Sequence, residues 1–110
     1  EDSPRYGYGS PHAQEVAYVF MHLDPEDPQS TESDLALSET MGTYWTNFAK
    51  YGNPNGEGVP EWPAFSASDP KVMYLDSDPN PGPVPSETSL QVLDSYFKWR
   101  FTPKGMDWAQ

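Results

Sequence analysis

The chain has 110 residues, 35% of them apolar, which is enough for one small domain and too few for two. Seventeen Asp and Glu against six Lys and Arg give a net charge of −11, which argues against binding to nucleic acid or to an anionic membrane surface. There is no cysteine for disulfides or thiolate metal sites, and no apolar run approaches the roughly 20 residues of a membrane span.

The first predicted element is a histidine loop at residues 7–20. Its opening is rich in Gly and Pro, and Val16, Val19 and Phe20 then recur at the i, i+3, i+4 spacing of one helix face. We therefore expect a short helix that begins just after His12, with a short strand as the alternative. Residues 21–33 are acidic and interrupted by proline, which predicts a surface loop.

The strongest helical pattern covers residues 34–51. Its apolar side chains follow one stripe along the helix: Leu37, Met41, Tyr44, Trp45, Phe48 and Tyr51. Thr31 or Ser33 can cap the start, and Lys50 followed by Gly52 is typical of a helix end. We interpret the stripe as a packing surface rather than as the lining of a substrate gorge.

A turn-rich connection follows at residues 53–70, with Trp62 and Phe65 as the expected anchors. Residues 71–76 (KVMYLD) form an apolar run too short for a helix, which predicts a strand.

The final helix is predicted at residues 86–101, after a proline-rich loop at residues 77–85. One face of this helix is apolar, and Pro103 is expected to end it. The members of that face are Leu90, Leu93, Phe97 and Phe101.

The titratable side chains near the start raise two kinds of site. His12 and His22, with Glu15 and Asp24, suggest a metal, but their spacing does not provide the three or four ligands that zinc requires, so we expect no metal. A histidine in a Gly- and Pro-rich turn suits a general base, because imidazole titrates near neutral pH and a loop can present it from a rigid scaffold. An ordinary surface histidine is the alternative.

Several segments, in their order along the chain, resemble type-B carboxylesterases and cholinesterases. GSPHAQEVAYVF looks like the family's Gly-x-x-His-x-x-Glu segment, and WTNFAKYGNPN looks like the end of its penultimate long helix. WPAF, VMYLD and SYFKW are similar to the segments that follow, although SYFKW lacks the family's cysteine. The resemblance covers residues 7–101.

The resemblance implies an α/β-hydrolase C-terminal fragment with two main helices, a short strand and long proline-rich loops, lacking most of the central sheet. It implies that His12 is the catalytic histidine and that Gly9 lets the backbone turn before it. Glu15 would stabilise the loop through hydrogen bonds or be an ordinary first-turn acid. The chain contains no Gly-x-Ser-x-Gly elbow, so the nucleophile and its acid are expected upstream. Because the first residue is Glu1 rather than Met, we expect the chain to begin inside a longer reading frame.

We therefore expect residues 1–110 to be part of a serine carboxylester hydrolase that needs no cofactor. The expected partners are the rest of the hydrolase and a carboxylic ester, with self-association through any apolar helix face left exposed. The family resemblance suggests a secreted or periplasmic location. One alternative is a catalytically dead, cholinesterase-like adhesion module. Another is a free-standing module that binds glycans through Trp45 and Trp62.

Overall fold

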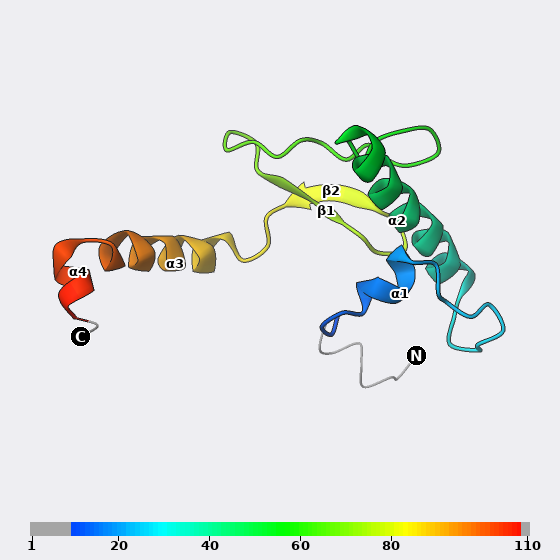
Figure 1. Ribbon diagram of the computed structural model, residues 1–110, viewed down its shortest axis with the longest axis horizontal. Coiled ribbons are helices and arrows are strands. Elements are labelled where there is room, and N and C mark those ends of the chain that lie inside the picture. The colour runs from blue at the N-terminus through cyan, green and yellow to red at the C-terminus, as the bar shows by residue number, and fades with distance from the viewer. Residues whose placement is uncertain (1–9, 109–110) are drawn as a thin grey trace.

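The computed structural model describes residues 10–108, which form four helices and two strands. In chain order these are α1 (Glu15–Val19), α2 (Glu32–Tyr51), β1 (Lys71–Tyr74), β2 (Asn80–Pro83), α3 (Glu87–Arg100) and α4 (Pro103–Asp107). The molecule is elongated, with α3 and α4 extending away from the other elements (Figure 1). Its radius of gyration is 18.7 Å, whereas a compact chain of 100 residues has about 13 Å. No helix in the described part of the chain is both long and apolar enough to cross a membrane.

Local hydrogen bonds define both ends of α2. The Thr31 hydroxyl accepts from the Asp34 amide at 3.2 Å, and the Asp34 carboxylate accepts from the Thr31 amide at 2.9 Å, which completes a capping box. This cap starts the helix two residues before the predicted position. At the other end, Gly52 adopts a left-handed φ of 67° and its amide donates to the Phe48 carbonyl at 2.8 Å.

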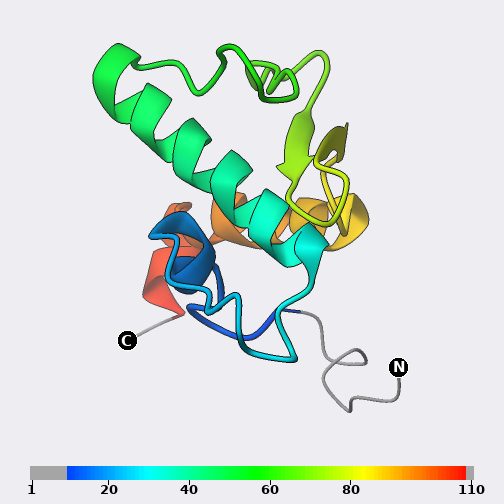
Figure 2. The same cartoon turned by 90° about the vertical axis from the view of Figure 1, so that its right-hand side faces the viewer.

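The core of the described residues is small and belongs mainly to α2. Met41 and Tyr44 are its buried apolar side chains, and Tyr44 has no exposed surface. The helix α1 lies against the first half of α2 (Figure 1 and Figure 2). The buried Ser38 hydroxyl of α2 donates to the Tyr18 carbonyl of α1 at 2.7 Å, so a polar contact joins the two helices where few apolar side chains are buried.

The strands β1 and β2 pair antiparallel, with Lys71 opposite Pro83 and Tyr74 opposite Asn80. The prediction that residues 77–85 are entirely loop was wrong, because residues 80–83 form β2. This strand has the sequence NPGP, whose residue types are depleted in strands, so pairing with β1 rather than intrinsic propensity produces it.

The two C-terminal helices contact each other and no other described element. Pro103 was expected to end the last helix, but it is also the first residue of α4, where a missing amide costs nothing. The Thr102 hydroxyl caps this helix by accepting from the Gly105 amide at 3.2 Å. Large apolar side chains remain exposed on α3: Leu90, Val92, Leu93, Tyr96, Phe97 and Trp99.

Candidate functional site

His12 lies exposed in a tight turn directly before α1. The Gln14 amide donates to the Pro11 carbonyl at 3.3 Å, which closes a four-residue turn with His12 and Ala13 at its centre. Ala13 has a positive φ of 63°. Its carbonyl accepts from the Val16 amide at 3.3 Å, so the turn leads directly into the helix.

The scaffold behind this turn is the contact between α1 and α2. The Tyr18 hydroxyl donates to the Asp34 carboxylate at 2.9 Å, near the cap of α2. Hydrogen bonds from the Thr31 hydroxyl and amide, and then from Tyr18, hold the pKa of Asp34 below its usual value of 3.8 and outweigh the opposing effect of burial. The charged Asp34 carboxylate therefore stabilises the packing of α1 on α2. Because the turn that carries His12 leads directly into α1, this packing also fixes the position of the turn.

The sequence also singled out Gly9 and Glu15 near His12, and His22 as a candidate metal ligand. Gly9 lies outside the described residues. Glu15 is exposed at the first position of α1, and its side chain has no hydrogen bond to another residue within 10–108. The ring of His22 lies 6.2 Å from that of Phe20. Nowhere in residues 10–108 do three His, Asp or Glu side chains gather as a metal site would require.

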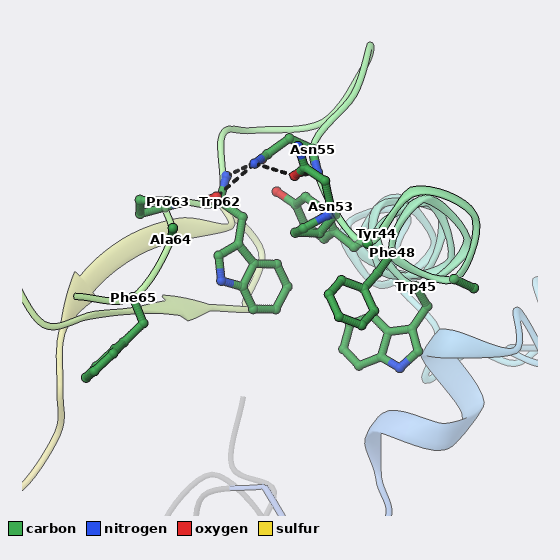
Figure 3. A pocket seen from close by; sticks show the side chains of 12 residues that line it. Tyr44, Trp45, Phe48, Asn53, Asn55, Trp62, Pro63, Ala64 and Phe65 are labelled. Carbon is green, nitrogen blue, oxygen red and sulfur yellow. Dashed lines mark hydrogen bonds between the residues drawn. The ribbon is translucent and has the colours of Figure 1, made fainter. Parts of the chain in front are cut away.

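A second feature is an aromatic groove of about 870 Å³ between the end of α2 and the loop that follows it (Figure 3). Its lining includes the side chains of Tyr44, Trp45, Phe48, Asn55, Trp62 and Phe65. The rings of Trp62 and Tyr44 form a T-shaped pair, with centroids 5.1 Å apart and planes at 83°, so this predicted anchor does pack. The other predicted anchor, Phe65, also lines the groove but is 65% exposed, so its role as an anchor stays a prediction.

Asparagines hold the wall of the aromatic groove in place. The Asn55 side chain accepts from the Trp62 amide at 2.6 Å and donates to the Trp62 carbonyl at 2.9 Å. It also donates to the Asn53 side chain at 3.0 Å (Figure 3). Asn47 of α2 donates to the Pro54 carbonyl at 3.1 Å. These asparagines belong to the family motif WTNFAKYGNPN, and their role in holding the groove was not predicted, although asparagine side chains commonly hydrogen-bond to the backbone of turns.

The chemistry of the aromatic groove suits contact with an apolar surface. Its ionisable lining group is the Tyr44 phenol, whose pKa is raised by burial and whose hydroxyl donates to the Pro60 carbonyl at 2.7 Å. The rings of Trp45 and Trp62 lie 6.4 Å apart at 58°, so they do not form a flat platform. The groove can therefore bind or pack, and the imidazoles of the described residues, His12 and His22, both lie exposed and outside its lining.

Comparisons with known proteins agree with the sequence motifs. The model of the carboxylesterase family matches residues 2–95. A medium-chain fatty acyl-CoA hydrolase precursor from Anas platyrhynchos is 43% identical over 61% of this chain and 11% of its own length. A pyrethroid hydrolase from Mus musculus is 38% identical over 73% of the chain and 14% of its length. Acetylcholinesterase from Gallus gallus is 35% identical over 87% and 12%.

Solved structures give the same result for the fold. A PNB esterase superposes on 74% of this chain with a TM-score of 0.63 and 35% identity, and a thermophilic PNB esterase does so with a TM-score of 0.65 and 34% identity. The matched part is 17% and 18% of those chains. These matches confirm the expected fold class, part of an α/β-hydrolase without most of its central sheet. The chain spans between a tenth and a fifth of the length of these relatives, and it belongs to the carboxylesterase family.

Proposed function

We propose that this chain is the C-terminal, histidine-bearing part of a serine carboxylester hydrolase, and that His12 is its general base. The observation that carries the proposal is the placement of His12, an exposed imidazole in a turn fastened through α1 to α2. Family membership supports it, because the fatty acyl-CoA, pyrethroid and PNB relatives are named as hydrolases or esterases.

In this mechanism the imidazole of His12 takes the proton of a serine hydroxyl as the serine oxygen attacks the ester carbonyl. The same proton then passes to the departing alcohol, which leaves an acyl-enzyme. A water molecule, deprotonated by the same imidazole, attacks the acyl group, and the proton returns to the serine when the acid leaves. His12 therefore shuttles one proton in each half-reaction and needs no cofactor.

The attacking serine and the acidic partner of His12 would belong to other parts of the hydrolase. The 110 residues contain no Gly-x-Ser-x-Gly motif, which is the strand–turn–helix elbow that exposes such a serine. The exposed apolar side chains of α3 and the aromatic groove fit this view, since both would be buried against the missing sheet and helices.

The test compares the two histidines of the chain in the full-length protein with p-nitrophenyl acetate as substrate. We expect His12→Ala to lower kcat by at least about 1000-fold, because it removes the base from both half-reactions, while the circular dichroism spectrum stays unchanged. His22→Ala is the matched control and is expected to keep wild-type kcat. The isolated 110-residue chain should give no saturable turnover. A folded His12→Ala variant that retains kcat would refute the proposal.

A further inference from the structure

The turn that carries His12 has an unusual residue at its third position. Pro11, His12, Ala13 and Gln14 form the turn, closed by the 3.3 Å hydrogen bond from the Gln14 amide to the Pro11 carbonyl. The positive φ of 63° places Ala13, the third residue of this turn, in the left-handed region, where turns usually have Gly or Asn. Ala13 has a left-handed backbone conformation, which residues with a Cβ rarely adopt.

Contacts on both sides of Ala13 hold this conformation. On one side is the turn hydrogen bond across His12. On the other, the Ala13 carbonyl accepts from the Val16 amide at the start of α1. That helix is in turn fixed by Tyr18 and Ser38 to α2. A strained backbone residue persists where its surroundings over-determine it, and such residues concentrate at functional sites.

We propose that Ala13 is a positioning residue for His12, which sets the direction of the imidazole through its left-handed backbone. This inference rests on the proposed function of His12. If φ at residue 13 returned to the negative region, the peptide between His12 and Ala13 would rotate relative to α1, and the imidazole would move while α1 stayed packed on α2. A displacement of about 1 Å at a catalytic group lowers the rate about 100-fold.

The experiment uses Ala13→Val and Ala13→Asn in the full-length protein with p-nitrophenyl acetate. The two side chains are similar in size, but valine is excluded from positive φ and asparagine tolerates it. We expect Ala13→Val to lower kcat about 100-fold while KM stays within about twofold of the wild-type value. We expect Ala13→Asn to keep most of the wild-type kcat. Ala67→Val is the matched control, since Ala67 is exposed in a turn and has no positive φ.

The outcomes separate this inference from the proposed function. If His12→Ala is inactive but Ala13→Val keeps wild-type kcat, the positioning role is refuted and the role of His12 stands. If Ala13→Val does not fold, Ala13→Asn decides the matter, because a folded asparagine variant that loses kcat as His12→Ala does would also refute positioning through φ. A low kcat in Ala13→Val together with a near wild-type kcat in Ala13→Asn supports the positioning role of Ala13. If His12→Ala itself is active, the proposed function fails first.

Discussion

Asn55 offers the sharpest test of how the aromatic groove is held together. Its side chain makes two hydrogen bonds to the backbone of the half-buried Trp62, at 2.6 and 2.9 Å. Substituting Asn55→Ala removes both and leaves the Trp62 amide and carbonyl without these partners. A net hydrogen bond contributes about 0.5–1.5 kcal/mol, and an unpaired buried group costs about 1–3 kcal/mol, so we expect a local loss of about 2–3 kcal/mol.

Hydrogen exchange at the Trp62 amide measures this loss in the full-length protein. Because about 1.4 kcal/mol corresponds to a factor of ten, exchange should be roughly 30 to 150 times faster in Asn55→Ala. Asn80→Ala is the control, because the side-chain amide of Asn80 makes one exposed hydrogen bond, to the Asp78 carbonyl. This substitution should leave exchange at the Trp62 amide unchanged. Exchange at Trp62 that is the same in Asn55→Ala as in the wild type would refute the reasoning.

Two further predictions concern the cap of α2 and the contact between α3 and α4. The pKa of Asp34 is lowered in the folded state, first by the Thr31 hydroxyl, so its stabilising effect is present above the unfolded value of 3.8 and is lost as pH falls through the folded pKa. Asp34→Asn should therefore show a weaker fall in melting temperature with acid below pH 3.8, and an unchanged slope would contradict this. Gly105→Ala would place a Cβ 2.8 Å from the Arg100 Cα, so it should separate α4 from α3 at a cost of about 1–3 kcal/mol. The measurement is hydrogen exchange at the Met106 amide, which should be faster in Gly105→Ala. Lys104→Ala, at an exposed position, is the control. Wild-type protection of this amide in Gly105→Ala would contradict the prediction.

Local patterns were sufficient for the two long helices. In α2 the signals are all local: the apolar stripe around Met41 and Tyr44, the capping residue Thr31 and the terminal Gly52. Neighbouring residues in the sequence are therefore enough to predict this helix. The strand β2 was missed because Asn, Pro and Gly disfavour strands, and its pairing with β1 depends on a partner several residues away.

The candidate site divides in the same way. The sequence alone determined that His12 stands in a Gly- and Pro-rich turn before a helix, because turn residues and helical spacing are local properties. Only the tertiary structure decided that Tyr18 meets Asp34, that Ser38 holds the backbone of α1, and that Asn55 pairs with Trp62. These contacts join residues separated by 7 to 20 positions, and their geometry follows from how the elements pack rather than from the composition of any one segment.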